Sequence, residues 1–268
     1  MKIGGIVLCG GKSSRMGRPK AWLPFCGEFM LQRAVRVLSE VVEPIVVVAA
    51  RNQDVPPLPS EVAIVRDEID EKGPLAGLAA GLAALAGQCD AVYLSACDVP
   101  FLKPEFVRRV ISFLGEAISE KPPPPSPLPE GKGEQARDPA GFGTRFADNS
   151  FSPFPSGRGD GGGGSAPKAP IPSGQAGWWI ATAVPRVGGF LHPLAAVYRI
   201  EVVPAVRAML AAGQLRATDL FDRVPTRVIE PEELTDADPE LASLRNLNSP
   251  EDYEAALRLL PTGAEERP

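Results

Sequence analysis

The sequence predicts an α/β protein, a Rossmann-like domain of three layers (α/β/α) around a mostly parallel central sheet. Short apolar runs alternate with longer segments of helical periodicity, which is the pattern of βαβ units. The runs are almost entirely apolar rather than alternating, as expected of parallel strands that helices cover on both faces. The first run leads into a glycine pair, Gly10-Gly11, and glycine turns after first strands are common in such folds.

Four runs in the first hundred residues are predicted to be buried strands. They span residues 3–9, 45–50, 62–65 and 91–96. Three apolar stripes at helical spacing fill the gaps and follow the last run. Their members are Leu31, Val35, Leu38 and Val41; Leu75, Leu78, Leu82 and Leu85; and Phe106, Val110 and Phe113.

The composition changes after Ile118. Residues 121–177 contain 12 prolines and 12 glycines in 57 positions and almost no aliphatic side chains, so this segment cannot build a core. We interpret it as a disordered, low-complexity insertion that interrupts a single domain spanning residues 1–268. A proline-rich stretch can also be a ligand for domains that bind polyproline helices, and the sequence leaves that alternative open.

Strand-like runs return after the insertion, at 178–184 and 194–198, so the sheet is expected to resume there. Helices are predicted at about 201–212 and 250–260. Ser249 suits the N-cap of the second, with Pro250 at its first helical position.

The overall composition excludes several classes of protein. The net charge of −5 offers no positive field for a phosphate polymer, so nucleic acid is not an expected partner. The four cysteines form no CxxC pair and lie mostly in apolar runs, as reduced, buried thiols do. The apolar run before Gly10 is too short for a signal peptide, and no segment has membrane length. A soluble, cytoplasmic protein is expected.

The segment that follows the first strand has the composition of a phosphate-binding loop. Gly10 and Gly11 let backbone N–H groups turn toward an anion, and four cationic side chains follow, Lys12, Arg15, Arg18 and Lys20. The spacing is neither that of a Walker A loop nor that of the GxGxxG dinucleotide fingerprint. On composition alone, a glycine turn with a solvated basic tail fits the segment equally well.

Two carboxylates follow other predicted strands. Asp98 comes directly after the strand at 91–96, at the edge where open α/β sheets bind ligands, and a single carboxylate there can bind Mg²⁺ together with substrate phosphates. Asp67 follows the strand at 62–65, and Gly73-Pro74 then opens a helix whose N-terminus favours phosphate. An Asx turn before Pro100 and a simple loop around Asp67 are the structural alternatives.

In its motifs the sequence resembles a known family, the MobA-type molybdenum cofactor guanylyltransferases, within the larger group of nucleotide-sugar-like transferases. Five motifs occur in the family's order and cover the chain except for 121–177. They are Leu8-Cys9-Gly10-Gly11-Lys12-Ser13-Ser14-Arg15-Met16-Gly17 with Lys20; Asp67 with Gly73-Pro74-Leu75-Ala76-Gly77; Cys97-Asp98-Val99-Pro100-Phe101-Leu102; His192-Pro193-Leu194-Ala195-Ala196-Val197-Tyr198; and Asn246-Leu247-Asn248-Ser249-Pro250-Glu251-Asp252.

The resemblance implies a role for particular residues. Leu8, Cys9 and Gly10 would contact the nucleotide, with Gly11 supporting the loop, and Asp67 would contact it as well. Lys20 would neutralise the phosphates, and Asp98 would bind both the nucleotide and Mg²⁺.

The chain departs from the family pattern at two positions. Cys9 stands where alanine is usual, which is a mild change because a free cysteine behaves as a small hydrophobe. Ala49 stands where the family often has an asparagine that helps to hold the nucleotide, and Asn52 is a candidate substitute.

Several further residues can each be interpreted in two ways. The family motif places His192 near the pterin side, but a histidine before proline at a strand start is as often structural. Trp178 and Trp179 are better explained by packing than by stacking on a pterin. Asn246 and Asn248 either position the acceptor or cap the last helix.

The resemblance implies transfer of GMP from GTP to molybdopterin, with release of pyrophosphate. Mg²⁺ on Asp98 would screen the triphosphate, and Lys20 and Arg15 would stabilise charge on the departing pyrophosphate. Molybdoenzymes or other proteins of the cofactor pathway are candidate partners. The rivals are the same chemistry with CTP, a sugar-phosphate nucleotidyltransferase, and a non-catalytic nucleotide-binding carrier of the cofactor.

Overall fold

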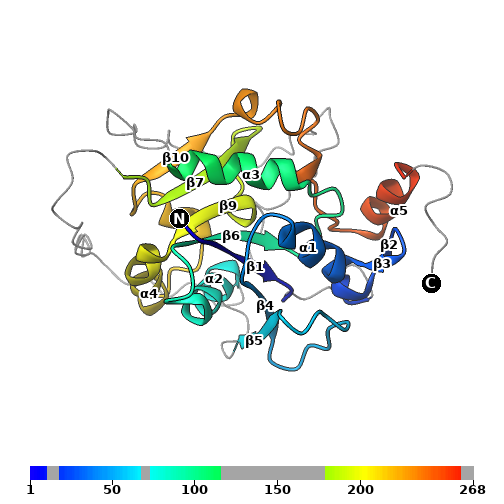
Figure 1. Cartoon of the computed structure of the whole chain (residues 1–268), viewed down its shortest axis with the longest axis horizontal. Helices are drawn as coiled ribbons and strands as arrows, with labels where there is room; N and C mark the ends of the chain where they lie inside the picture. Colours follow the sequence, from blue (N-terminus) through cyan, green and yellow to red (C-terminus); the bar gives the residue numbers. More distant parts are fainter. Residues whose placement is uncertain (11–17, 68–72, 116–178, 261–268) are drawn as a thin grey trace, which may run out of the picture.

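The computed structural model describes residues 1–10, 18–67, 73–115 and 179–260. Their framework is an eight-stranded sheet in the order β10-β7-β9-β6-β1-β4-β5, with β8 paired to β7 (Figure 1). The strands are β1 Ile3–Leu8, β4 Ile45–Ala50, β5 Ala63–Asp67, β6 Ala91–Ala96, β7 Thr182–Val187, β8 Phe190–Leu191, β9 Ala196–Arg199 and β10 Thr226–Ile229. A small hairpin of β2 Pro24–Phe25 and β3 Glu28–Phe29 stands apart from this sheet.

The prediction of a mostly parallel sheet is confirmed. The pairs β6–β1, β1–β4, β4–β5 and β10–β7 are parallel. Strand β9 runs antiparallel to both of its neighbours, β6 and β7. The carboxyl ends of β1, β4, β5 and β6 therefore lie along one edge of the sheet.

Helices cover both faces of the sheet, which gives the predicted three layers (Figure 1). They are α1 Met30–Ser39, α2 Gly73–Leu85, α3 Pro104–Ser112, α4 Val203–Ala211 and, at the periphery, α5 Pro250–Arg258. Val7 of β1 packs in one core cluster with residues of α1 and α3, whereas its neighbours Ile6 and Leu8 pack in the other with α2 and α4. Strand β1 is thus buried on both faces, as its continuous apolar run predicts.

Helix α2 lies unusually close to β1 because glycines face the strand. A Cβ atom at Gly77 would stand 2.9 Å from Cδ2 of Leu8, and one at Gly81 would stand 2.6 Å from Cδ1 of Ile6. Gly73 begins the helix with a φ of +70°, a conformation that glycine adopts without strain. The close approach brings the N-terminal end of α2 near the carboxyl end of β1.

The third predicted strand differs from the prediction of a buried run at 62–65. Strand β5 spans Ala63–Asp67, one to two residues later, and its side chains are largely exposed, with Ile64 at 42%. The reason is its place at the end of the strand order, where β4 is its only pairing partner among the described residues. An apolar run alone does not distinguish an edge strand from a central one.

Two later elements also begin after their predicted positions. Strand β7 starts at Thr182 rather than in the Trp178-Trp179 pair, and Leu194 belongs to a 3₁₀ turn, η3 Pro193–Ala195, that precedes β9. Helix α5 begins at Pro250, and the hydroxyl of Ser249 accepts from the backbone N–H of Asp252 at 3.2 Å, so the predicted N-cap is confirmed.

The predicted insertion, 121–177, lies outside the described residues, and the interpretation of 1–268 as a single domain stays a prediction. The strands that follow it join the same sheet as those that precede it, because β9 pairs with β6.

All four cysteines are free thiols; Cys9, Cys89 and Cys97 are buried and Cys26 is partly so. Within the described ranges, no helix has both the length and the apolar character needed to cross a membrane.

Candidate functional site

The candidate site lies where β1 and β6 end side by side. The backbone N–H of Cys97 donates to the carbonyl of Leu8 at 3.0 Å, and the N–H of Cys9 donates to Val48 in β4 at 2.8 Å. Leu8 and Cys9 are therefore held between two strands, while Gly10 is exposed at the edge. The other predicted loop residues, Gly11 and Arg15, lie outside the described residues.

Lys20 and Asp98 meet directly, although they are 78 positions apart in the sequence. Lys20 lies in a 3₁₀ turn, η1 Lys20–Trp22, and its Nζ stands 2.6 Å from Oδ2 of Asp98. Both side chains are largely shielded, with 21% and 10% exposure. A desolvated pair of this kind interacts more strongly than a surface salt bridge.

The other carboxylate oxygen of Asp98 is buried without a partner. Oδ1 accepts no hydrogen bond from any residue that the structure describes. A buried ionised oxygen is costly unless it is bonded, so an unpaired one at a binding edge is a position for a ligand or an ion.

Asn248 completes a three-residue cluster with Lys20 and Asp98. Lys20 Nζ also donates to Oδ1 of Asn248 at 3.3 Å, and the N–H of Leu247 donates to the backbone carbonyl of Asp98 at 3.0 Å. Because Ser249 caps α5, the side chain of Asn248 is not needed as the cap. Of the two interpretations that the sequence left for Asn248, its position favours the one at the site.

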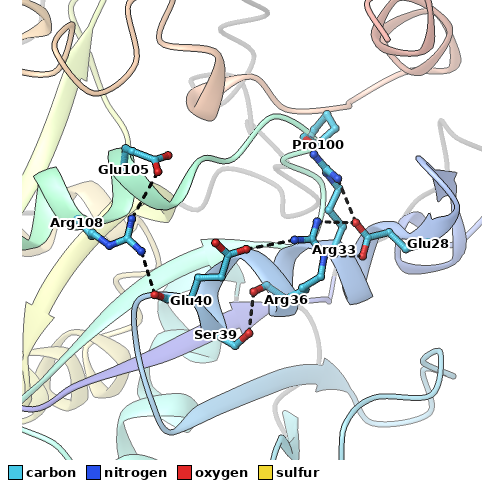
Figure 2. A network of polar contacts seen from close by, with 8 residues as sticks. All are labelled: Glu28, Arg33, Arg36, Ser39, Glu40, Pro100, Glu105 and Arg108. Carbon is cyan, nitrogen blue, oxygen red and sulfur yellow. Dashed lines mark hydrogen bonds and ion pairs between the residues drawn. The ribbon is translucent and has the colours of Figure 1, made fainter. Parts of the chain in front are cut away.

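The loop that carries Asp98 is also tied to α1. Arg33 donates through Nε to the carbonyl of Pro100 at 2.7 Å, and its Nη1 lies 3.1 Å from Glu28 (Figure 2). Glu28 is shared with Arg36. Figure 2 shows this network extending to Arg108 of α3, which donates to the carbonyl of Glu40 at 3.1 Å. Nothing in the sequence motifs singled out Arg33.

Gln53 is a second residue that the sequence reasoning missed. It follows β4 in a turn, and its Nε2 reaches back to the carbonyl of Cys9 at 2.8 Å and to its thiol at 3.2 Å. Its Oε1 accepts from the N–H of Ala50 at 3.3 Å. Gln53 thus holds the backbone of Cys9, at the start of the segment predicted to bind the nucleotide. A glutamine in a turn after a strand carries no signal of such a role.

The position where the family often has asparagine is closed to a ligand. Ala49 is 1% exposed and packs in the core with Cys9. Asn52, the candidate substitute, is exposed and forms no side-chain hydrogen bond with another described residue. The side-chain amide that bonds Cys9 is instead that of Gln53.

The thiols of Cys9 and Cys97 meet just after the ends of β1 and β6. The two side chains pack in the same core cluster. A hydrogen bond to the Cys9 side chain and burial both raise the pKa of the Cys97 thiol, so it stays protonated at neutral pH.

Asp67 lies at the same edge but not beside Asp98. It ends β5, and the order β6-β1-β4-β5 places three strand spacings between the two acids. At about 4.8 Å per spacing, their strand ends are roughly 14 Å apart, which is too far for both to ligate one ion. An extended ligand is needed to contact both.

His192 and Trp179 behave as structural residues. The backbone N–H of His192 donates to the backbone carbonyl of Pro185 at 2.9 Å. Burial lowers the pKa of the His192 imidazole to about 4. A neutral imidazole at pH 7 is a poor electrostatic partner for phosphate. Trp179 is packed beneath Arg199, whose guanidinium carbon lies 5.8 Å from the ring centroid, in line with the packing interpretation; Trp178 lies outside the described residues.

The side-chain atoms available as metal ligands suit a cation that is held mainly by the substrate. Among the described residues, no group of three or more histidine, cysteine, aspartate or glutamate side chains could hold a metal ion. Asp98 Oδ1 is a single hard oxygen donor, and Mg²⁺ is commonly bound by one or two carboxylates with phosphate oxygens and water. The residues present therefore fit a divalent ion that arrives with a triphosphate.

Comparison with known proteins agrees with this geometry. Residues 5–122 match the family model of a MobA-like NTP transferase domain. A probable molybdenum cofactor guanylyltransferase of Mycobacterium avium is 40% identical over 124 residues, which are 45% of this chain and 61% of the relative. The corresponding protein of Mycolicibacterium paratuberculosis is 42% identical over 125 residues, with the same two shares. The chain thus spans about three fifths of the length of these curated relatives.

A solved structure shares the fold over nearly the whole chain. It is the molybdopterin-guanine dinucleotide biosynthesis protein A from Archaeoglobus fulgidus, with a TM-score of 0.61 and 16% identity, and the match covers 96% of this chain and 97% of that one. At this identity the likeness concerns the fold alone, and it confirms the predicted fold class. The resemblance predicted from the motifs is thereby confirmed for residues 5–122, which match the model of a MobA-like NTP transferase domain.

Proposed function

We propose that this chain transfers GMP from GTP to molybdopterin, giving the guanine dinucleotide form of the molybdenum cofactor and pyrophosphate. The observation that carries the proposal is the Lys20–Asp98 pair at the carboxyl edge of β1 and β6, with Oδ1 of Asp98 left for a ligand. The curated relatives, named probable molybdenum cofactor guanylyltransferases, supply the substrate class.

Asp98 would hold a divalent cation, and we propose Mg²⁺. When bound, such an ion screens the triphosphate and polarises its phosphoryl oxygens. The unpaired Oδ1 is the donor that this chain contributes, because Oδ2 is engaged by Lys20.

The reaction needs no covalent intermediate on the protein. An oxygen of the acceptor's terminal phosphate bonds to the α-phosphorus of GTP, while the bond from that phosphorus to the oxygen bridging to the β-phosphate breaks and pyrophosphate leaves. Lys20, together with Arg15, is proposed to stabilise the charge on the pyrophosphate. Leu8, Cys9, Gly10 and Gly11 would hold the nucleotide, so that positioning supplies most of the rate.

Asp67 and Asn248 are proposed to act at two ends of the bound substrates. Asp67, at the carboxyl end of β5, would contact the nucleoside part of GTP. Asn248, beside Lys20 and Asp98, would position the acceptor, because it is the third polar side chain at the reacting centre. The strand order keeps these contacts well apart.

Pyrophosphate release with each NTP, in the presence and absence of molybdopterin, tests the proposal. We expect release that requires molybdopterin and Mg²⁺ and is fastest with GTP. Release that is fastest with CTP would replace the guanylyl assignment with the cytidylyl one. Release that depends on a sugar phosphate instead would indicate the sugar-nucleotide rival, and GTP binding without release would indicate a carrier.

The cellular compartment of the reaction and the proteins that receive its product are also proposals. We place it in the cytoplasm, with molybdoenzymes or other proteins of the cofactor pathway receiving the product. Fractionation of cells that express the chain, with detection of both protein and transfer activity, checks the compartment.

A further inference from the structure

The carboxylate of Asp238 is fully buried, yet the reaction described above does not use it. Asp238 is 0% exposed and lies between two 3₁₀ turns, η6 Pro231–Glu233 and η7 Ala242–Leu244. Its Oδ1 lies 2.8 Å from Nζ of Lys103, and its Oδ2 accepts from the N–H of Ser243 at 2.7 Å. Burying a carboxylate is unfavourable unless it is paired in this way, and breaking such a pair is strongly destabilising locally.

Ser243 joins this pair to the loop that carries Asp98. Its hydroxyl accepts from the N–H of Lys103 at 3.1 Å and donates to the carbonyl of Phe101 at 3.4 Å. Lys103, Asp238 and Ser243, which we call the latch, therefore bond one another across 140 positions of sequence. The latch fixes the segment after β10 against the start of α3, and Figure 1 shows the chain passing this end of α3 on its way to α5.

The latch also holds a strained turn. Leu241 has a φ of +48°, a region that non-glycine residues seldom adopt, and it is nevertheless buried. Its N–H donates to the backbone carbonyl of Asp238 at 2.9 Å. Strain of this kind persists only where surrounding contacts over-determine the conformation, and it concentrates near functional sites.

The segment that leaves the latch leads directly to the candidate site. Four residues after Ser243, Leu247 donates its N–H to the carbonyl of Asp98 at 3.0 Å, and Asn248 then accepts from Lys20 at 3.3 Å. The Asp98 loop is thus bonded to the same segment at two points, at Phe101–Lys103 and at Asp98 itself. The turn that Asp238 closes holds the first of these points, Ser243, in place.

We propose that Asp238 is a positioning residue, which sets residues 246–248 against the Asp98 loop and so places Asn248 for the acceptor. The inference deepens the proposed function and rests on it for its kinetic part. The side chain of Asp238 bonds Lys103 and Ser243 and is not part of the Lys20–Asp98–Asn248 cluster. It acts through Ser243 and the backbone of the segment that Ser243 begins.

Three variants separate this role from general stability. In Asp238→Asn the amide oxygen still accepts from Ser243 but the charged partner of Lys103 is lost, and Lys103, 43% exposed, can return to water. Ser243→Ala removes the links to Phe101 and Lys103 and leaves the Asp238–Lys103 pair. Asp236→Asn is the matched control, since Asp236 is a nearby acid with a side chain that is 65% exposed.

The first measurement is amide hydrogen exchange by NMR, which does not depend on activity. Loss of a hydrogen bond to a charged group weakens a structure by a factor of roughly 10 to 100. We expect the Leu247 N–H to exchange faster by about that factor in Asp238→Asn. In Ser243→Ala, which removes only neutral hydrogen bonds, it should exchange roughly 2- to 12-fold faster. Amides of β1 should be unchanged, as should the Leu247 amide in Asp236→Asn. Unaltered protection of Leu247 in both latch variants would overturn the inference even if the proposed function holds.

The second measurement is a double-mutant cycle on guanylyl transfer, at a temperature where every variant is folded. If Asp238 acts through Asn248, the acceptor KM rises in Asp238→Asn while the KM of GTP stays near that of the wild type. The double variant Asp238→Asn/Asn248→Ala then resembles Asn248→Ala alone. Fully additive losses in kcat/KM would show two independent effects and overturn the positioning role. Absence of transfer by the wild type would refute the proposed function, and the exchange experiment would still decide the latch.

Discussion

Lys20 and Asp98 form a shielded ion pair of 2.6 Å that engages only one of the two carboxylate oxygens. In the proposed function, Lys20 would face the phosphates, and the second oxygen of Asp98, Oδ1, would be the donor to a cation. The pair joins a turn after the phosphate-loop segment to the end of β6.

Replacing Asp98 should abolish turnover without unfolding the chain. Asp98→Asn keeps the shape of the side chain but removes the charge, and the loss of a metal ligand removes several kcal/mol of transition-state stabilisation, about a thousandfold in rate. Steady-state kinetics and the melting temperature measure the two effects, with Asp236→Asn as the surface control. Unchanged guanylyl transfer in Asp98→Asn would exclude Asp98 as the metal ligand.

The sequence predicted the part of this site that is local to strand ends. Asp98 follows a buried apolar run directly, and the carboxyl ends of parallel strands are where such sheets bind ligands, so its position follows from general rules. The Lys20–Asp98–Asn248 cluster does not, because it depends on how segments up to 228 positions apart pack together. Arg33 and Gln53 were missed for the same reason, because each bonds a backbone atom far away in the sequence. Asp238 was missed because its charged partner, Lys103, lies 135 positions away.

The fold was predicted for a similar reason and with a similar limit. Apolar runs and helical stripes identify strands and helices, and they gave the layers correctly. They do not give the strand order, which makes β5 an edge strand and places β9 antiparallel between β6 and β7. Those features arise from connections that periodicity does not encode.

Gln53 should affect the nucleotide more than the acceptor. Gln53→Ala removes the donor to the Cys9 carbonyl, and a neutral hydrogen bond contributes about 0.5–1.5 kcal/mol. We expect the KM of GTP to rise roughly 2- to 12-fold, with the acceptor KM nearly unchanged. Asn52→Ala, one position away and exposed, is the matched control. An equal change in the two variants would refute a specific role of Gln53.

The close contact of α2 with β1 predicts that Gly81→Ala destabilises the protein. Alanine in place of glycine favours a helix by about 1 kcal/mol, but its Cβ would lie within 2.6–2.8 Å of three atoms of the Ile6 side chain. Overpacking in a core costs about 1–3 kcal/mol, and Ile6 is buried in a central strand with little room to move. Denaturant unfolding should show a net loss of up to about 2 kcal/mol. A gain in stability would mean that Ile6 repacks freely.

Deleting residues 121–177 should preserve folding and turnover. Arg199 of β9 bonds the carbonyl of Ile180 through Nε at 2.8 Å and that of Leu114 through Nη2 at 3.1 Å. One guanidinium thus brings together the two described ends that flank the deleted segment, and residues 116–120 with 178 remain to join them. Melting and transfer assays of the deletion variant test this. A collapse of either would show that the segment is integral to the fold or the site.

His192 should make the protein less stable in acid. The imidazole is the only one in the chain, and burial lowers its pKa to about 4 in the folded state. The unfolded chain, with a histidine pKa near 6.5, takes up a proton between about pH 6.5 and 4 that the folded chain does not, so stability falls as the pH falls through that window. The difference of about 2.5 units corresponds to roughly 3 kcal/mol at most. NMR titration gives the pKa directly, and His192→Gln should lose less stability than the wild type between pH 7 and 4, since both share the response of the carboxylates. An imidazole that titrates near 6.5 in the folded protein would show that it is solvated, and the acid sensitivity would then have to come from other groups.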